Sequence, residues 1–236
     1  MEVGSLSFKR LMKDVRSIMK QPLHEHGIYY SHNEDNILKG YALIIGPEDT
    51  PYAYGYYLFQ IDYPPEYPLA PPKFTFLTNG DNIRMNPNLY RSGKVCVSIL
   101  NTWRGDQWSS CQTLKTILLT LLTILNDKPL LNEPGYNETS DDFISYNNII
   151  TYKNIEVAIL NVIDNKISPS ICSKFKNDII VNFKSNYLKI MDTINKEIKI
   201  MGTVDTLIHT KVYSMRVDLK YNDLKSRIQK IFKKYK

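Results

Sequence analysis

The segment that most constrains the fold is Tyr63-Pro64-Pro65-Glu66-Tyr67-Pro68-Leu69-Ala70-Pro71-Pro72, which carries five prolines. Proline donates no backbone hydrogen bond, so this segment cannot pair as a central strand and is expected to be a stiff, exposed connection. On either side of it, residues 55–62 and 73–77 are rich in aromatic and branched side chains and predict strands. Residues 38–45 predict a further strand, and a turn over residues 46–51 follows it.

Helical periodicity precedes and follows these strands. Residues 5–19 interleave apolar and basic side chains with the spacing of an amphipathic helix, which ends before Pro22. Residues 113–125 predict a second helix with a wide apolar face, and Ser109 or Ser110 is its expected N-cap.

The C-terminal third is also largely helical by periodicity. Residues 142–163 and 173–200 predict two helices separated by Ser168-Pro169, and residues 221–235 predict a final amphipathic helix. Residues 207–219 alternate too weakly to assign. A helix, then strands, then a loop and more helices is an order typical of an α+β fold with an antiparallel sheet.

The bulk composition indicates a globular protein. A chain of 236 residues suits one large domain, or one domain with an extension. Its hydrophobic content of 43% suffices for a buried core, and its three cysteines do not suggest a secreted disulfide scaffold. Residues 1–13 are polar and basic rather than a signal segment, and the longest apolar stretch, 117–125, is too short to cross a bilayer. We therefore expect a soluble protein of a reducing compartment, cytoplasmic or nuclear, with no membrane partner.

The net charge of +6 and the isoelectric point near 9.0 raise the question of nucleic-acid binding. Much of the excess charge lies near the C-terminus, in Lys220, Lys225, Arg227, Lys230, Lys233, Lys234 and Lys236. A basic, solvated face of the last helix explains this cluster more simply than DNA or RNA binding, so we expect no nucleic-acid partner. Retention on heparin that is lost only at high salt would favour the nucleic-acid alternative.

The stretch Asn86-Pro87-Asn88-Leu89-Tyr90-Arg91-Ser92-Gly93-Lys94-Val95-Cys96 lies in an irregular region, residues 81–100, that is dense in Asn, Pro and Gly. So long an irregular stretch within a compact domain is either a functional loop or a region where regular elements have been missed. A lone cysteine flanked by valines is by default a small buried hydrophobic residue. The position of Cys96 on this loop, upstream of Trp103 and Trp108, instead favours a functional thiol.

Taken together, these segments resemble the ubiquitin-conjugating (E2) enzyme family over residues 5–163. In that family an asparagine-containing tripeptide precedes the thioester cysteine by a short, fixed spacing, as Asn86-Pro87-Asn88 precedes Cys96 here. The proline-rich segment matches the family's proline-rich loop, and Trp108-Ser109 matches the tryptophan that opens the following helix. Residues 129–134 match the family's acidic, proline-bearing gate.

The resemblance implies the UBC fold: an N-terminal helix, a four-stranded antiparallel meander sheet, a central helix and C-terminal helices. The fourth strand is expected within residues 23–30. The ubiquitin-conjugating domain is expected over residues 5–200, and a C-terminal helical extension over residues 201–236.

Within the family, the sequence is most similar to the Z type. Asn86 stands where other members carry histidine, residues 101–107 form an insertion before Trp108, and the gate reads Asn132-Glu133-Pro134-Gly135-Tyr136. The extra C-terminal length agrees with this assignment.

The resemblance implies an acyl carrier. Ubiquitin, or a ubiquitin-like modifier, would pass from an activating enzyme (E1) to Cys96 as a thioester, and then to a substrate lysine with or without a ligase (E3). A thiolate suits this task because its thioester reacts readily with amines, whereas serine would give a less reactive ester. The four histidines lie outside the motif segment, which favours a carrier over a hydrolase with a cysteine–histidine pair.

Two further consequences follow from this resemblance. ATP is used by the E1, so we expect neither a cofactor nor a metal on this chain. The alternative is a noncatalytic ubiquitin-binding scaffold built on the same fold, which the presence of Cys96 disfavours.

Two residues besides Cys96 receive catalytic roles from the resemblance. Asn88 matches the family asparagine that stabilises the oxyanion or braces the loop, and a plain turn asparagine is the alternative. Glu133 aligns with an acidic residue that orients the incoming lysine, and an exposed loop acid is its alternative. Asp127 is a weaker candidate for the same role.

Docking residues are also implied by the resemblance. Leu69 matches the apolar position by which E2 enzymes dock RING or HECT ligases, and Ser110 lies in the second ligase-docking loop. Lys9, Arg10 and Lys13 match the basic patch that meets the activating enzyme, although a plain solvated helix face is a serious alternative.

Overall fold

The computed structural model describes residues 5–80, 82–201 and 205–235. Residues 1–4, Asp81, residues 202–204 and Lys236, which belong to the predicted N-terminal, loop and extension segments, lie outside the described residues. The main sheet consists of β1 (Ile28–His32), β2 (Lys39–Ile45), β3 (Tyr56–Asp62) and β4 (Lys73–Phe76). Its strands are antiparallel and follow the order β1-β2-β3-β4, so the predicted four-stranded meander is confirmed.

Strand β1 begins later than the predicted range of 23–30. Residues His24–His26 form a 3-10 turn instead, and Gly27 leaves that turn with a φ of 69°, a conformation that favours glycine. The chain therefore enters the sheet only at Ile28, which pairs with Ile44 of β2.

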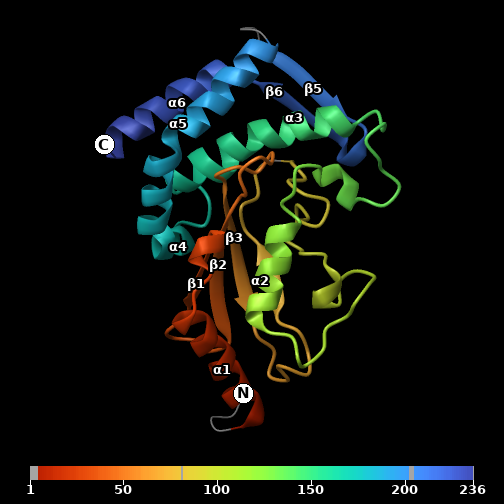
Figure 1. Cartoon of the computed structure of the whole chain (residues 1–236), viewed down its shortest axis with the longest axis vertical. Helices are drawn as coiled ribbons and strands as arrows, with labels where there is room; N and C mark the ends of the chain where they lie inside the picture. The colour runs from red at the N-terminus through yellow and green to blue at the C-terminus, as the bar shows by residue number, and fades with distance from the viewer. Residues whose placement is uncertain (1–4, 81, 202–204, 236) are drawn as a thin grey trace.

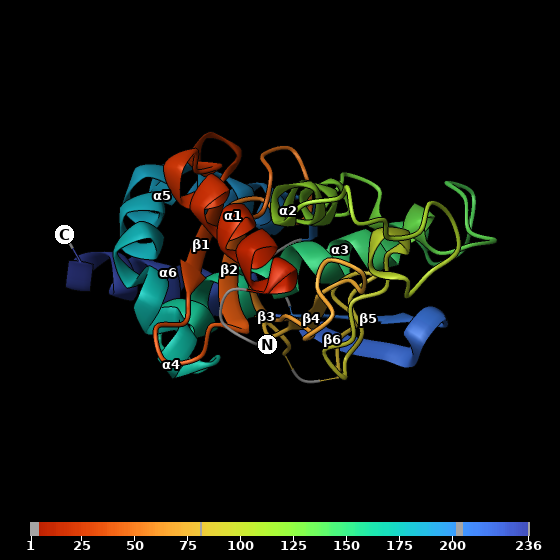
Figure 2. The same ribbon diagram turned by 90° about the horizontal axis from the view of Figure 1, so that it is seen from below.

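The core lies between the sheet and the helices α1 (Leu6–Lys20) and α2 (Leu114–Thr123). In Figure 1 α2 lies in front of the sheet, and in Figure 2 α1 and α2 lie next to each other over the strands. Large aromatic side chains fill this layer: Phe59 of β3 pairs with Phe76 of β4 and is fully buried. Burial of such side chains supplies most of the driving force for folding.

The N-caps of α1 and α2 are a serine and a threonine, and the second corrects a prediction. Ser5 caps α1, because its Oγ accepts a hydrogen bond of 3.2 Å from the backbone N–H of Phe8. Helix α2 is capped by Thr113, whose Oγ1 accepts from the N–H of Thr116 at 3.3 Å, and not by Ser109 or Ser110. A turn over residues 109–112 precedes this cap, so the helix begins one turn later than those serines would require.

After α2, the chain forms α3 (Phe143–Lys153), which continues directly into a π-helical segment, Asn154–Asn161. Asn154 is buried there: its amide accepts from the Tyr57 hydroxyl at 2.6 Å and donates to the carbonyl of Ala53 at 2.9 Å. Gly55 is required at this contact, because a Cβ on it would lie 1.9 Å from Oδ1 of Asn154. The π segment thus aims a polar side chain at the β2–β3 turn.

The predicted helix over 173–200 is confirmed as α5 (Lys176–Met201), which follows the short helix α4 (Pro169–Cys172). The expected helical extension over 201–236 is corrected, because its described part starts with a two-stranded sheet, β5 (Thr206–Thr210) and β6 (Met215–Leu219). Only α6 (Tyr221–Tyr235) is the predicted terminal helix.

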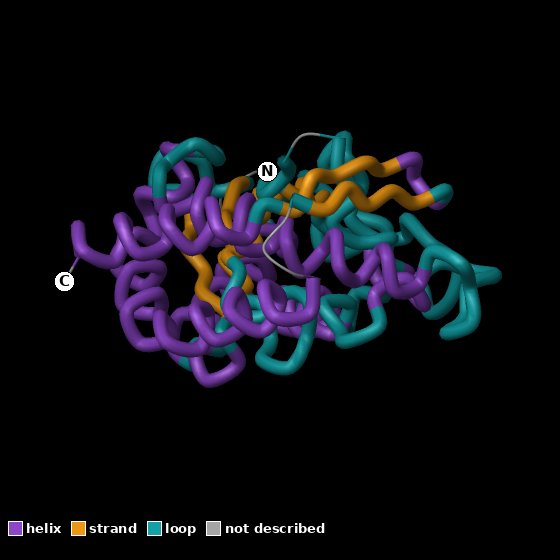
Figure 3. Tube along the Cα trace, turned by 90° about the horizontal axis from the view of Figure 1, so that it is seen from above, coloured by secondary structure: helices purple, strands orange, loops and turns teal. Residues whose placement is uncertain are grey.

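The β5–β6 hairpin and α6 pack against the preceding helices. The hairpin lies beside α3, and α6 runs along α5, where Phe232 stacks on Tyr187 with ring centroids 3.7 Å apart (Figure 1). Figure 3 shows loops gathered at one end of the molecule, next to this hairpin. None of the helices in the described ranges is long and apolar enough to span a bilayer.

Candidate active site around Cys96

Cys96 and Asn88 are joined by two hydrogen bonds. The backbone N–H of Cys96 donates to the carbonyl of Asn88 at 2.8 Å, and the side-chain amide of Asn88 donates back to the carbonyl of Cys96 at 2.7 Å. The segment has little regular pairing, with isolated bridges such as Leu89 to Val95. These reciprocal bonds therefore set the backbone position of the cysteine. The Asn88 amide group points at the backbone of Cys96, which is the geometry of a brace.

Asn86 fastens this loop to the rest of the domain. Its side chain is fully buried and donates to the Tyr52 hydroxyl at 2.7 Å and to the carbonyl of Ile124 at 2.8 Å. Its Oδ1 accepts from the backbone N–H of Asn88 at 2.8 Å. A carboxamide can donate and accept at once, so asparagine provides the loop-holding hydrogen bonds at this position.

Arg84 also supports the same loop. Its guanidinium donates to the carbonyls of Asn86 at 3.1 Å and Pro87 at 2.6 Å. The same group lies 3.3 Å from the ring centroid of Tyr90 and 4.9 Å from that of Tyr213. Aromatic faces and carbonyl oxygens stabilise a buried cation, so these contacts offset the cost of burying the Arg84 guanidinium.

The thiol of Cys96 is covered. The residue is 2% exposed, and its Sγ donates to the carbonyl oxygen of Thr102 at 2.7 Å. The hydroxyl of Thr102 in turn accepts from the N–H of Val97 and lies 3.0 Å from the carbonyls of Val95 and Val97. The start of the insertion over residues 101–107 therefore forms a lid directly on the cysteine.

The gate segment lies close to this lid. An open depression of about 610 Å³ is lined by Pro134, next to Glu133, and by residues of the insertion that include Thr102 and Trp103. The carboxylate of Glu133 accepts a hydrogen bond from the hydroxyl of Tyr213, which lies on the β5–β6 hairpin. The depression is therefore bordered by the lid that covers Cys96 and by the gate.

One carbonyl oxygen links the gate and the cysteine loop. The carbonyl of Ile124, at the end of α2, accepts from the side chain of Asn86 at 2.8 Å and from that of Asn132 at 3.1 Å. Asn86 is part of the loop that carries Cys96, and Asn132 directly precedes Glu133. The end of α2 thus sets the spacing between the two halves of the site.

A family model described as "Ubiquitin-conjugating enzyme" matches residues 10–154. The chain belongs to this family. The matched region includes the cysteine loop, its lid and the gate. The prediction of the family, which was made from these motifs, is confirmed.

The resemblance to the Z type is also confirmed. Ubiquitin-conjugating enzyme E2 Z of Xenopus tropicalis is 40% identical over 160 residues, which are 66% of this chain and 50% of that protein. The human protein of the same name is 39% identical over 160 residues, 66% of this chain and 45% of that one. The chain spans about half the length of these curated relatives. A solved structure of human ubiquitin-conjugating enzyme E2 G1 is 29% identical and covers 49% of this chain and 90% of its own, with a TM-score of 0.43.

The basic residues expected to meet an activating enzyme fall into two groups. Lys9 and Lys13 are exposed on α1. Arg10 instead donates to the carboxylate of Asp14 at 2.9 Å and to the carbonyl of Ser110 at 2.6 Å. Its guanidinium is therefore used within the chain.

The two positions expected to dock ligases lie on neighbouring loops. Leu69 is 81% exposed on the proline-rich connection, and Ser110 is exposed on the turn before α2. The indole N–H of Trp108 donates to the carbonyl of Pro68 at 2.7 Å and joins these loops. Arg10 joins the second of these loops to α1, because its guanidinium donates to the carbonyl of Ser110. An apolar tip on a loop held in this way loses little conformational entropy on binding.

The sequence interpretation did not include four residues of this site: Thr102, Arg84, Arg91 and Tyr213. Thr102 belongs to the insertion that marks the Z type, but nothing in the pattern shows that it covers a thiol. Arg84 and Arg91 flank the asparagine motif and could have been noticed as the two arginines of this loop. Tyr213 lies far downstream in a segment left unassigned, so no local signal connects it to Glu133.

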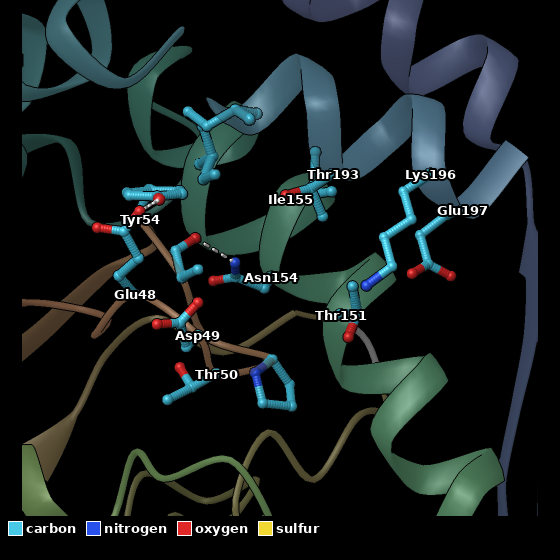
Figure 4. A pocket seen from close by; sticks show the side chains of 14 residues that line it. Glu48, Asp49, Thr50, Tyr54, Thr151, Asn154, Ile155, Thr193, Lys196 and Glu197 are labelled. Atoms are coloured by element: carbon cyan, nitrogen blue, oxygen red, sulfur yellow. Dashed lines mark hydrogen bonds between the residues drawn. The ribbon is translucent and has the colours of Figure 1, made fainter. Parts of the chain in front are cut away.

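A polar pocket of about 360 Å³ lies elsewhere, between the β2–β3 turn and α5 (Figure 4). It is lined by Glu48, Tyr54 and Glu197 among others, and by none of the predicted site residues. The hydroxyl of Tyr54 donates to the carboxylate of Glu48 at 2.6 Å there, a contact of the same chemical type as that between Tyr213 and Glu133.

Proposed function

We propose that the chain is an active E2 enzyme that carries ubiquitin, or a ubiquitin-like modifier, as a thioester on Cys96. The proposal is supported chiefly by the position of Cys96, which lies on a braced loop directly under the lid segment that borders one depression together with the gate segment. The family match to residues 10–154 agrees with this assignment.

The proposed reaction consists of two acyl transfers. In the first, the Cys96 thiolate attacks the carbonyl carbon of the modifier's thioester on the E1, and the thiolate of the E1 leaves. In the second, the uncharged amine of a lysine attacks the carbonyl carbon of the Cys96 thioester. The new C–N bond forms, the C–S bond breaks, the Cys96 thiolate is released and the amine loses its extra proton to water.

Asn88 and Glu133 have different roles in the proposal. The bond from Asn88 to the Cys96 carbonyl supports a bracing role, since it orients the cysteine backbone during both transfers. The carboxylate of Glu133 would orient the acceptor amine by hydrogen bonding rather than act as a strong base, because a nearby carboxylate favours the protonated amine.

The lid adds a condition to the first transfer. A thiol that is 2% exposed cannot reach the end of another protein, so the segment that carries Thr102 must move before Cys96 can be loaded. We propose that docking of the E1 or of the modifier stabilises this opened arrangement.

The partners are proposed on the same basis. Exposed Lys9 and Lys13 are suited to contact an acidic surface of the E1, and Leu69 with Ser110 to contact an E3. ATP enters only at the E1, and neither transfer on this chain requires a cofactor.

A charging assay tests the proposal. The chain is incubated with ATP, ubiquitin and each of a panel of activating enzymes, and the products are separated on nonreducing gels beside Cys96→Ala and Cys96→Ser. We expect a thiol-sensitive adduct that Cys96→Ala abolishes and that Cys96→Ser converts into a thiol-resistant ester. A folded chain that gives no adduct, yet binds ubiquitin, would instead establish the alternative of a noncatalytic scaffold.

A further inference from the structure

The tip of the β5–β6 hairpin reaches the gate of the proposed active site. Tyr213 lies at this tip, 80 positions after Glu133, and its hydroxyl donates a hydrogen bond to the Glu133 carboxylate. The hairpin lies beside the loop-rich end of the molecule (Figure 3). The contact is therefore made between the C-terminal extension and the conjugating domain.

The backbone of the tip is held in an unusual conformation. Tyr213 and Ser214 have φ angles of 58° and 48°, in the left-handed region that residues other than glycine rarely adopt. Such strain persists only where the surroundings determine the conformation, and it is concentrated at functional sites. Two sets of hydrogen bonds hold the tip of the hairpin in this conformation. The guanidinium of Arg91 donates to the carbonyl of Tyr213. The Asp142 carboxylate accepts from the N–H groups of Lys211 and Val212 at 3.0 and 2.7 Å.

The ring of Tyr213 is also fixed from both loops and helices. It lies 4.9 Å from the Arg84 guanidinium and packs edge-to-face on Tyr146, with ring centroids 6.1 Å apart. Burial, together with the adjacent Glu133 carboxylate, raises the pKa of the Tyr213 hydroxyl well above its ordinary value of 10.0. The hydroxyl therefore remains a donor throughout the pH range in which lysine amines are acylated.

We propose that Tyr213 is a positioning residue for acceptor lysines, which it orients by holding the carboxylate of Glu133. The proposal rests on the function proposed above. Tyr213 binds Oε2 of Glu133, while Oε1 has no hydrogen-bond partner among the described residues. One carboxylate oxygen is thus anchored and the other is available to an incoming amine.

The contact between Tyr213 and Glu133 affects only the second transfer, in which a lysine amine attacks the Cys96 thioester. The amine donates a hydrogen bond to Oε1, attacks the thioester carbonyl and loses its proton to water, so Glu133 and Tyr213 keep their protonation states. An anchored carboxylate lowers the entropy lost when the amine is oriented. Without the hairpin contact, Glu133 would be a mobile side chain on an exposed loop.

The test uses the full chain with Tyr213→Phe, which keeps the ring packing but removes the hydroxyl. Ubiquitin is loaded on Cys96 by an activating enzyme, or by exchange from ubiquitin that carries a C-terminal thioester of a small thiol. Discharge is then followed as a single turnover at several concentrations of free lysine and from pH 7 to 9. Loss of one hydrogen bond is expected to slow lysine-dependent discharge about two- to tenfold.

Further variants separate positioning from a structural effect. Hydrolysis of the thioester without lysine, and the melting temperature, should be nearly unchanged by Tyr213→Phe. Glu133→Ala should slow discharge, and adding Tyr213→Phe to it should cause little further loss, because both changes remove the same interaction. Two matched controls are Tyr54→Phe, which breaks a tyrosine–glutamate bond in the pocket of Figure 4, and Tyr221→Phe, which removes a buried hydroxyl without a hydrogen-bond partner in the described structure.

The outcomes are distinct. Wild-type chain that loads and discharges ubiquitin while Tyr213→Phe discharges it equally fast would overturn this inference and leave the proposed function intact. Fully multiplicative losses in the double variant, or equal slowing by Tyr54→Phe, would also overturn it. A wild-type chain that accepts ubiquitin on Cys96 by neither route would overturn the proposed function, and this inference with it.

Discussion

The thiol of Cys96 donates a 2.7 Å hydrogen bond to the carbonyl oxygen of Thr102, so the residue proposed as the nucleophile is covered by the insertion that follows it. The Thr102 hydroxyl joins this lid to the backbone on both sides of the cysteine by hydrogen bonds at Val95 and Val97. The reactivity of Cys96 should therefore depend on how often these hydrogen bonds open.

Replacement of Thr102 with valine is the first prediction. The substitution removes the hydroxyl at nearly constant side-chain volume, so the lid should open more often. The rate at which iodoacetamide alkylates Cys96 should rise about two- to tenfold, the equivalent of one hydrogen bond. Peptide mapping by mass spectrometry measures this rate, with exposed Cys111 as an internal reference that should not change. Thr102→Ser keeps the hydroxyl and is the control; equal Cys96 alkylation in wild type and Thr102→Val would show that the hydroxyl does not hold the lid.

The second prediction separates Arg10 from its basic neighbours. Arg10→Ala would leave the carboxylate of Asp14, which is 5% exposed, without its cationic partner. The free energy of unfolding, measured with urea, should fall by about 1–3 kcal/mol. Lys9→Ala and Lys13→Ala should leave stability unchanged and slow loading by the E1, more so at low ionic strength. Stable Arg10→Ala protein with a selective loading defect would instead place Arg10 in the E1 contact.

Strands β2 to β4 could be predicted from the sequence because their alternation and their proline-rich boundary are local properties of the chain. The hairpin over β5 and β6 could not, since only Met215, Val217 and Leu219 alternate clearly on β6. These three side chains are buried where the hairpin packs beside α3, and such long-range packing leaves little mark on a short segment.

The candidate site shows the same division between local and long-range information. Cys96 and Asn88 were found because their spacing resembles a family motif, and their reciprocal hydrogen bonds are local. The lid on Cys96 depends on how an insertion folds back, and the contact of Glu133 with Tyr213 joins segments 80 positions apart. Neither arrangement follows from residue type or spacing.

The third prediction concerns the anchor of the hairpin. The carboxylate of Asp142 is buried and accepts from two backbone N–H groups, at Lys211 and Val212. In Asp142→Asn one oxygen becomes an NH2 group, which cannot accept, so one of these N–H groups loses its partner. The free energy of unfolding should fall by about 1.5–3 kcal/mol, and amide exchange at Lys211 and Val212 should accelerate. Asp141→Asn is the matched control, because the contact of that carboxylate within the described residues is an exposed ion pair with Lys211. Exchange that is equally fast in both variants would contradict the anchoring role.

The fourth prediction is a pH dependence that arises from Cys172. Burial raises the pKa of this thiol from its ordinary value of 9.0 to about 11. A raised pKa in the folded state means that the folded chain holds the proton more tightly than the unfolded chain. The resulting stabilisation is complete below pH 9 and is lost as the pH rises towards 11.

Urea unfolding under reducing conditions at pH 8, 9.5 and 10.5 measures this contribution as the difference between wild type and Cys172→Ala. Buried tyrosines such as Tyr52 also have raised pKa values, but they are common to both proteins and cancel in the difference. The advantage of the wild type should shrink steadily across this range, because only its thiol is forced to stay protonated by folding. A difference that stays constant with pH would mean that the Cys172 thiolate is tolerated in the folded protein. Cys172→Ala would then act only through the loss of the sulfur and of its hydrogen bond to the carbonyl of Ile167.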